Sequence, residues 1–189
     1  MRKSKNQLKN GKQHGYWEEY HEDGSISSRG NYIDGVPDGL AENFYPNGPL
    51  KTKCTFKSGQ ANGLLKEYYA TGQLRKEIQW KNGKLNGYSK TYFDNGNLWL
   101  SFNYKDDKIH GIHIEYFRDG SIRYQNNSIK GEIEGQYEGY YENGQLWYRS
   151  GIHNGKSHGK FEHYNEDGSV IKIEKYENGK LIYATVDND

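Results

Sequence analysis

Residues 63–86 read GLLKEYYATGQLRKEIQWKNGKLN, and this stretch is the clearest copy of a unit that recurs along the chain. Its first residue, Gly63, recurs every 24 residues without insertion or deletion, at Gly15, Gly39, Gly87, Gly111, Gly135 and Gly159. Gly72 recurs in step in all seven copies, and Gly83 recurs except where Asp107 takes its place. A fixed period over seven copies indicates one structural unit stacked on its neighbours.

The period divides the chain into a leader, an array and a tail. Residues 1–14 form a basic leader with a half repeat that we expect to cap the array. The seven repeats form one repeat domain and span residues 15–38, 39–62, 63–86, 87–110, 111–134, 135–158 and 159–182. Residues 183–189 hold the end of a closing strand and an acidic tail.

Each repeat predicts a β-hairpin. Two short runs are separated by Thr71-Gly72 and followed by Asn82-Gly83, and Asn-Gly or Asp-Gly pairs favour two-residue type I′ turns. Asp107 interrupts the second turn column, but aspartate tolerates the left-handed backbone region better than most residues. The sequence therefore predicts an all-β fold, an elongated single-layer antiparallel β-meander of hairpin repeats in a twisted open sheet of about fourteen or fifteen strands.

If both turns of the repeat have two residues, the register in which its strands pair can be deduced. Numbered from its first glycine, each repeat then places its aromatic sixth position opposite its thirteenth, as with Tyr68 and Arg75. The other face collects positions 7, 12 and 18, such as Tyr69, Leu74 and Trp80, and is the more continuously apolar. We expect such a face to be covered by curling of the sheet, by a second copy of the chain or by a partner.

Composition narrows the function classes. The 189 residues are 32% hydrophobic and include 18 tyrosines, which suits a thin structure without a deep apolar interior. The net charge of +1 gives no reason to expect nucleic acid or an anionic membrane as a partner. A single cysteine, Cys54, favours a reducing compartment, and no apolar run resembles a signal peptide or membrane span. A cytoplasmic protein is predicted.

Motifs for catalysis are not found in the sequence. His110 and His158 both precede a repeat glycine, but about four strands, roughly 19 Å, separate them, too far to share a zinc ion. His153 and His158 flank one turn, where a weak two-histidine site is less favoured than a plain turn. Glutamates near the start of the repeats, among them Glu18, are expected to form a solvated row. We therefore expect no enzyme, no cofactor and no metal site.

The repeats are not equivalent. Trp99 and Trp147 replace short or charged residues at the thirteenth position, while Gly139 and Gly151 weaken the sixth repeat. Residues 125–130 are the least strand-like stretch. Such departures mark either a site grafted onto the scaffold or sequence drift. The residues that we predict to bind a partner are Tyr92, Trp99, Tyr116, Arg123, Tyr140 and Trp147.

The repeat pattern resembles a known family. The unit has the form Gly-x4-Tyr-Tyr-x-Asn-Gly-x-Leu, followed by an aromatic residue and Asn-Gly-Lys; in the third repeat it is carried by Gly63, Tyr68, Tyr69, Gly72, Leu74, Trp80, Asn82 and Gly83. This unit is similar to the MORN repeat variant and, more specifically, to the bacterial YwqK-like antitoxins. Asp107, Ser128 and Gly139 depart from the pattern locally.

The resemblance implies a bacterial antitoxin or immunity protein that neutralises a cognate protein toxin by direct binding, the toxin being encoded next door. The family pattern contains no catalytic residues to carry over. A second hypothesis is a scaffold or membrane-apposed assembly module, as other MORN proteins are thought to be, with a homodimer through the apolar sheet face. A third is a carbohydrate reader, which would require export.

Overall fold

The computed structural model describes residues 5–186, so the start of the predicted leader, residues 1–4, and the predicted acidic tail, residues 187–189, lie outside the described residues. The chain divides into two compact units, Met1–Gly96 and Asn97–Asp189. The described residues form β-strands and turns and contain no helix, and therefore no helix that is long and apolar enough to cross a membrane. The predicted all-β antiparallel meander is confirmed in each unit.

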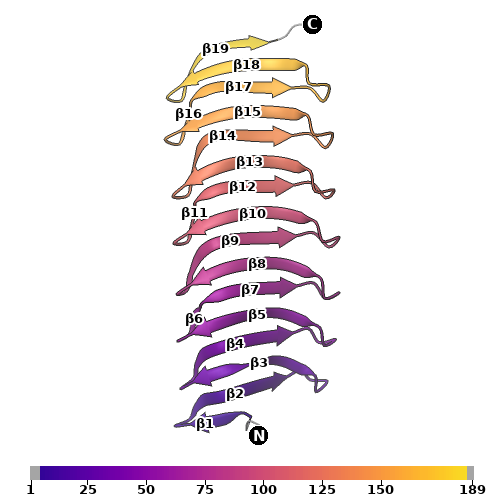
Figure 1. Cartoon of the computed structure of the whole chain (residues 1–189), viewed down its shortest axis with the longest axis vertical. Helices are drawn as coiled ribbons and strands as arrows, with labels where there is room; N and C mark the ends of the chain where they lie inside the picture. The colour runs from indigo at the N-terminus through magenta and orange to yellow at the C-terminus, as the bar shows by residue number, and fades with distance from the viewer. Residues whose placement is uncertain (1–4, 187–189) are drawn as a thin grey trace. The chain divides into compact units, whose positions relative to one another are not determined.

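The first unit contains nine strands that follow one another in chain order (Figure 1). They are β1 (Gln7–Lys9), β2 (Lys12–Tyr20), β3 (Ile26–Ile33), β4 (Val36–Phe44), β5 (Leu50–Lys57), β6 (Gln60–Ala61), β7 (Gly63–Tyr68), β8 (Leu74–Lys81) and β9 (Lys84–Tyr92). Consecutive strands pair antiparallel, except that β5 pairs with both β6 and β7.

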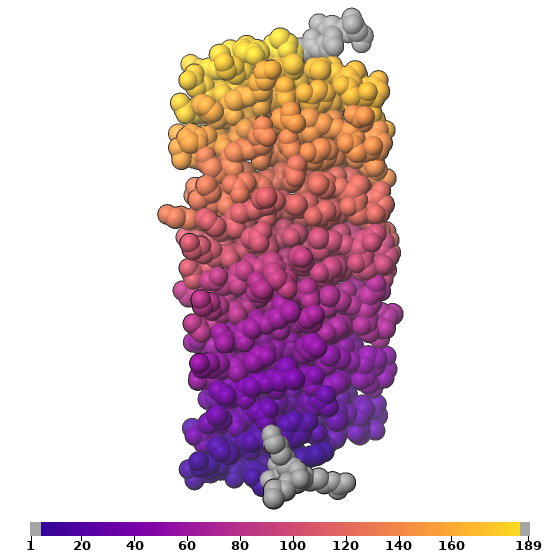
Figure 2. Space-filling model, in the orientation of Figure 1, coloured from indigo at the N-terminus to yellow at the C-terminus, as the bar shows by residue number. Residues whose placement is uncertain are grey.

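The second unit repeats this plan with ten strands. They are β10 (Leu98–Lys105), β11 (Lys108–Ile109), β12 (Gly111–Tyr116), β13 (Ile122–Ile129), β14 (Glu132–Tyr140), β15 (Leu146–His153), β16 (Lys156–Ser157), β17 (Gly159–Tyr164), β18 (Val170–Glu177) and β19 (Lys180–Val186). Here β10 pairs with β11 and β12, and β15 with β16 and β17. In the space-filling view, the residues of each unit follow one another in chain order as successive bands of colour (Figure 2).

The first glycine of the repeat lies in a bulge rather than in a tight turn. Lys57 pairs with Gln60, but Lys53 pairs with Lys66, so the strand after the turn contains two extra residues. Gly63, beside this insertion, has a φ of 125°, a backbone region that favours glycine. These bulges separate the two-residue segments β6, β11 and β16 from the strands that follow. If each of these three segments is counted as part of the strand that follows it, the nineteen described strands become sixteen. This is one more than the predicted fourteen or fifteen, and the additional strand is β1.

The two turns of the repeat differ. Asn82 and Gly83 both have positive φ, 51° and 74°, which confirms a type I′ turn, and Asp107 supports the same turn with a φ of 67°. In the first turn, the N–H of Tyr69 donates to the carbonyl of Gln73, and that of Gly72 donates back to Tyr69, both at 2.8 Å. This is a three-residue loop closed by a left-handed glycine, so the two-residue prediction for the first turn is wrong.

The longer loop also changes the register next to the turn, whereas the predicted pairing is kept from Glu67 and Lys76 onward. Tyr68 pairs with Leu74 and Glu67 pairs with Lys76, so Arg75 is an additional residue in a β-bulge, and the other described hairpins shift at the same place. The predicted pairing of positions 6 and 13 is therefore wrong. Because a one-residue shift moves side chains to the opposite face, position 12 joins position 6, whereas position 13 joins position 7. The predicted apolar face, which combined positions 7, 12 and 18, does not form.

One face of the sheet, here called the charged face, has positions 4 and 15 along its centre. Cross-strand ion pairs connect them, with Arg29 Nε 2.5 Å from Glu42 Oε2 and Lys66 Nζ 2.7 Å from Glu77 Oε1 in the first unit. Glu18, in the same column, is only 6% exposed. The expectation of a solvated row of glutamates is wrong for this column, because neighbouring strands and the tyrosines of position 6 cover it.

The other face, here called the aromatic face, has positions 3 and 16 along its centre. Large and small side chains share this column, in the order Trp17, Gly30, Ala41, Cys54, Leu65, Ile78 and Ser89 in the first unit. Among the described residues, Cys54 is the only hydrophobic one whose side chain is buried. Burial raises the pKa of its thiol. With no fully buried large side chain among residues 5–186, cross-strand pairs stabilise the sheet by about 0.2–1 kcal/mol each.

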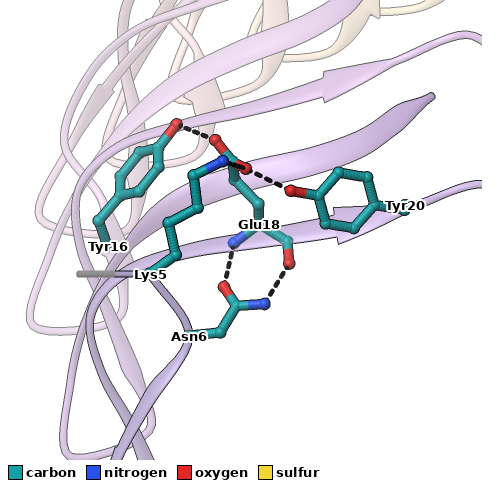
Figure 3. Close-up of polar contacts among 5 residues, drawn as sticks. All are labelled: Lys5, Asn6, Tyr16, Glu18 and Tyr20. Atoms are coloured by element: carbon teal, nitrogen blue, oxygen red, sulfur yellow. Dashed lines mark hydrogen bonds and ion pairs between the residues drawn. The ribbon is translucent and has the colours of Figure 1, made fainter. Parts of the chain in front are cut away.

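The edge of β2 is closed by two residues that precede β1 (Figure 3). The side-chain amide of Asn6 accepts from the N–H of Glu18 at 2.7 Å and donates to its carbonyl at 2.8 Å, as a strand would. The Glu18 carboxylate accepts hydrogen bonds from Lys5 at 2.5 Å, Tyr20 at 2.6 Å and Tyr16 at 3.0 Å. The backbone N–H and carbonyl of Glu18, in the part of β2 beyond its pairing with β1, are thus satisfied.

We expect the contribution of Glu18 to stability to be sensitive to acid. The hydrogen bonds from Lys5 and Tyr20 lower the pKa of Glu18 to about 2, below its ordinary 4.5. Because the folded pKa is depressed, the stabilisation is present above about pH 4.5 and is lost as the pH falls toward 2. Urea unfolding of the unaltered chain and Glu18→Gln should differ most near neutral pH and converge at acid pH. The exposed neighbour supplies the control, Glu19→Gln; a pH-independent difference for Glu18→Gln would contradict the assignment.

Candidate recognition site in the second unit

Three of the six predicted partner-binding residues line one hollow in the second unit. Arg123, Tyr140 and Trp147 belong to it; the hollow measures about 540 Å³, and its other lining residues are Phe117, Tyr124, Tyr141, Glu142, Asn143 and Glu166. Trp99 in β10 is 40% exposed and Tyr116 in β12 is half-buried, but neither lines it. Tyr92 lies in the first unit, where its hydroxyl donates to Glu77 at 3.3 Å.

Four rings on the aromatic face, here called the ring cluster, support the hollow. Tyr137 and Tyr148 are stacked with centroids 5.3 Å apart, and the rings of Trp147 and Tyr148 are perpendicular with centroids 4.9 Å apart. Tyr124 lies 6.0 Å from Tyr137 and 6.4 Å from Trp147. Such ring pairs contribute about 0.5–1.5 kcal/mol each beyond the area that they bury, and they hold one another in place. The rings therefore form a preorganised surface.

Gly139 makes room for this cluster. It pairs with Tyr124 on one side and with Tyr148 on the other. A Cβ atom at Gly139 would lie 2.6 Å from Cε1 of Tyr148 and 3.1 Å from Cε1 of Tyr124, so both rings lean over the bare glycine backbone. The sequence analysis treated Gly139 only as a weak point and did not identify Tyr124, Tyr137 or Tyr148. A signal was available for two of them, since Tyr124 and Tyr148 place tyrosine at position 14 in the fifth and sixth repeats alone.

Gly139→Val is expected to displace the rings of Tyr124 and Tyr148 and to destabilise the second unit by about 1–3 kcal/mol through overpacking. Near-ultraviolet circular dichroism reports the ring packing, and urea unfolding reports the stability. Thr91→Val places the same side chain at the same repeat position in the first unit and serves as the control. An unchanged near-ultraviolet spectrum for Gly139→Val would show that the rings do not lie over this glycine.

Arg123 is held on the inner side of the hollow by groups of its own repeat. Its Nη1 lies 2.9 Å from Oε1 of Glu115, and its guanidinium lies over Tyr124 at 5.2 Å and over Phe117 at 5.8 Å. The positive charge is therefore matched by a carboxylate and two ring faces. Arg123 helps to build the hollow and is not a free cation within it.

The hydrogen bonds that join consecutive repeats also differ next to the hollow. The tyrosine at position 7 usually donates to the position-6 carbonyl of the next repeat at 2.9 Å; the pairs are Tyr45 with Tyr68, Tyr69 with Tyr92, and Tyr141 with Tyr164. Phenylalanine stands at this position in the fourth repeat, as Phe93, and in the fifth, as Phe117, and neither has a hydroxyl with which to donate to the next repeat. Beside the hollow, this hydrogen bond to the carbonyl of Tyr140 is therefore missing.

Tyr140 connects the hollow to the charged face. Its hydroxyl donates to Oε2 of Glu138 at 2.8 Å and accepts from Nε2 of Gln125 at 2.9 Å. Burial and the hydrogen bond to Glu138 raise the pKa of Tyr140. Burial opposes ionisation of Glu138, but hydrogen bonds from Arg149, Tyr140 and Gln125 outweigh it and lower the pKa of this carboxylate. The tyrosine is therefore fixed in place with its hydroxyl already engaged.

A second hollow, of about 680 Å³, lies around Arg149 and Gly151 on the charged face, but its charged groups bind one another. Arg149 Nε donates to Glu138 at 2.7 Å, and its Nη1 lies 3.7 Å from Glu162. His153 Nδ1 lies 2.5 Å from Oε1 of Glu134, whose pKa is lowered by the Asn154 N–H and then by His153. Because these charges are already paired, this hollow offers less to a ligand than the aromatic one.

The histidines of the sixth repeat do come near each other. The ring centroids of His153 and His158 are 5.8 Å apart. Within residues 5–186, no group of three or more histidine, cysteine, aspartate or glutamate side chains is placed to hold a metal ion. We assign no role to this pair.

The fold defines a class of protein, an array of antiparallel β-hairpin repeats whose positive-φ glycines recur with the period of the sequence. The MORN repeat variant family matches residues 13–34, 37–58, 61–82, 85–106, 133–151 and 157–178. These segments cover more than half of the chain, which therefore belongs to the MORN repeat variant family. A comparison with curated proteins gave no match. The family pattern omits residues 107–132, which supply Phe117, Arg123 and Tyr124 to the hollow.

Proposed function

We propose that this MORN repeat variant protein is a non-catalytic binding protein that holds a protein partner at the aromatic hollow of its second unit. The observation that carries the proposal is that the hollow joins Phe117, Arg123 and Tyr124, from the stretch that the family pattern omits, to residues of the next matched segment, where Trp147 is 38% exposed. Tryptophan, tyrosine and arginine are the residues that contribute most to protein interfaces. A regular repeat array provides a rigid frame for such a patch.

The arrangement of polar groups also favours binding over catalysis. Glu138 and Arg149 are fixed in ion pairs and hydrogen bonds on the charged face, and the Tyr140 hydroxyl is engaged by two neighbours. What the hollow presents is ring surface, supported by the stacked pair Tyr137 and Tyr148. Preorganised ring surface suits the burial of a partner's side chains, because little side-chain entropy is lost on binding.

The finer proposal is an antitoxin or immunity protein of the bacterial YwqK-like kind, acting in the cytoplasm on a toxin encoded by a neighbouring gene. It is supported by the resemblance of the whole repeat array to that family. The test is calorimetric titration of the purified chain with the product of the neighbouring gene, together with co-expression of the two in a host that the toxin inhibits. We expect a tight one-to-one complex and restored growth. Absence of both would sink the antitoxin proposal.

One observation favours a second candidate, an assembly module. The last strand, β19, pairs with β18, and its apolar residues Leu181, Ile182 and Tyr183 are 45%, 50% and 43% exposed. Such a strand edge is a template for pairing with another chain. In this case the chain should self-associate in sedimentation experiments or bind lipid vesicles, and a proline at Ile182 should abolish the association. A monomer that ignores lipid would exclude this candidate.

A further inference from the structure

The repeats place a cation over an aromatic ring at the first turn. The ring belongs to position 7 and the cation to position 13. Lys51 Nζ lies 5.5 Å from the ring centroid of Tyr45, and the Arg75 guanidinium lies 5.8 Å from that of Tyr69. Arg123 repeats the arrangement over Phe117 at 5.8 Å. A ring face near a cation is therefore a regular feature of this fold, with the cation supplied by the chain itself.

The sixth repeat keeps the ring and replaces the cation. Tyr141 occupies position 7, but position 13 is Trp147, whose ring lies 6.2 Å from that of Tyr141 at an angle of 51°. Both residues line the 540 Å³ hollow, and Trp147 is 38% exposed. Tryptophan is the strongest of the aromatic side chains in attracting cations. At this turn the fold thus presents two ring faces without a cation from position 13.

The hollow also has carboxylates of its own. Glu142 and Glu166 both line it and are exposed, and neither forms an ion pair with any of residues 5–186. The one cationic residue that lines the hollow, Arg123, is matched by Glu115 at 2.9 Å. The remaining charge around the rings is therefore negative, which adds to the attraction that the ring faces exert on a positive group.

We infer that the hollow receives a cationic side chain, arginine or lysine, from the protein partner, held between the faces of Trp147 and Tyr141 and the carboxylates of Glu142 and Glu166. This inference rests on the proposed function for the identity of the ligand as part of a protein. Arginine fits best, because its planar guanidinium stacks on a ring while its N–H groups donate to carboxylates.

The test uses a matched pair of small probes. N-acetyl-arginine amide carries the cation, and N-acetyl-citrulline amide is nearly the same shape without the charge. Titration of the full chain is followed through the indole N–H signals in nuclear magnetic resonance spectra, with the Trp147 signal assigned by its loss in Trp147→Phe. We expect the arginine probe to shift the Trp147 signal saturably at millimolar concentrations, and the citrulline probe to leave it unchanged. Equal shifts with both probes, or none with either, would overturn the inference.

Variants that remove carboxylate charges test which residues attract the arginine probe. In the double variant Glu142→Gln with Glu166→Gln, the arginine probe should bind about two- to fivefold more weakly, as loss of exposed charge contacts allows. Glu132→Gln with Glu177→Gln removes two exposed carboxylates that do not line the hollow and should have no effect. Unweakened binding by the first double variant would overturn the role given to the carboxylates.

Failure of this inference and failure of the proposed function give different results. If a protein partner binds through Trp147 but the arginine and citrulline probes behave alike, the proposed function is supported and the inferred preference for a cation is rejected. If the arginine probe binds at Trp147 while no protein partner does, the cation site stands and the proposed function falls.

Discussion

Gly151→Ala should destabilise the second unit by about 2–3 kcal/mol, the upper range for overpacking a well-packed site. Gly151 lies in β15, and a Cβ atom there would stand 2.1 Å from the carbonyl oxygen of His158 and 3.3 Å from its carbon. These are main-chain atoms, and the His158 N–H also donates to the carbonyl of Gly151 at 2.8 Å. The backbone cannot swing aside as a side chain would, so the methyl group must displace the strand. Urea unfolding with linear extrapolation measures the loss.

Gly30→Ala is the matched control. Gly30 also lies inside a strand, β3, but its Cβ would meet the Cβ of Ala41 at 3.4 Å, an ordinary contact. There the gain from replacing a flexible glycine should leave stability unchanged or raise it by up to about 1 kcal/mol. Equal losses for the two variants would show that the close approach at Gly151 is not what limits this position.

Trp147→Ala should weaken the complex with the protein partner by about 100-fold, since truncation of a central tryptophan costs 2 kcal/mol or more at an interface. The variant loses ring contacts of Trp147 but should remain folded, because Trp147 is 38% exposed and the rings of Tyr137 and Tyr148 still stack on each other. Calorimetric titration against the product of the neighbouring gene measures the affinity, and urea unfolding checks the fold.

Trp99→Ala is the control for this variant. Trp99 occupies the same position of the fourth repeat and is 40% exposed, but it does not line the hollow. Its truncation should change the affinity by less than about twofold, within the range of near-neutral interface contacts. If both tryptophans matter equally, recognition extends over the repeat columns and is not confined to the hollow.

The hairpin repeats could be predicted from the sequence because recurring glycine and asparagine residues indicate turn positions with positive φ. Asn82 and Gly83 have positive φ, as an Asn-Gly pair predicts. The pairing next to the first turn was not readable, because the two turns look alike in sequence and differ in whether the residue before glycine is also left-handed. Farther along the hairpin the pairing is the predicted one, as with Glu67 and Lys76. A loop one residue longer at Gly72 was enough to move Arg75 to the opposite face.

The site was readable in part for the same reason. Trp147 stands out against its repeat column, where Arg75 and Arg123 are ordinary members, so counting along the period finds it. The ring cluster depends on pairing across strands. Tyr148 lies opposite Gly139 in the predicted register as well, but Tyr124 lies opposite it only because of the register shift between β13 and β14. A glycine that weakens a strand when viewed alone becomes the space for two rings when its neighbours are known.

Hydrogen exchange of the chain with and without its partner tests most directly the claim that the hollow is the recognition site. We predict slower exchange on binding around the turns next to Phe117 and Glu142 and at Trp147 in β15, and no change in the strands of the first unit. Protection confined to the first unit or to the paired charges around Arg149, with the hollow unchanged, would contradict the account.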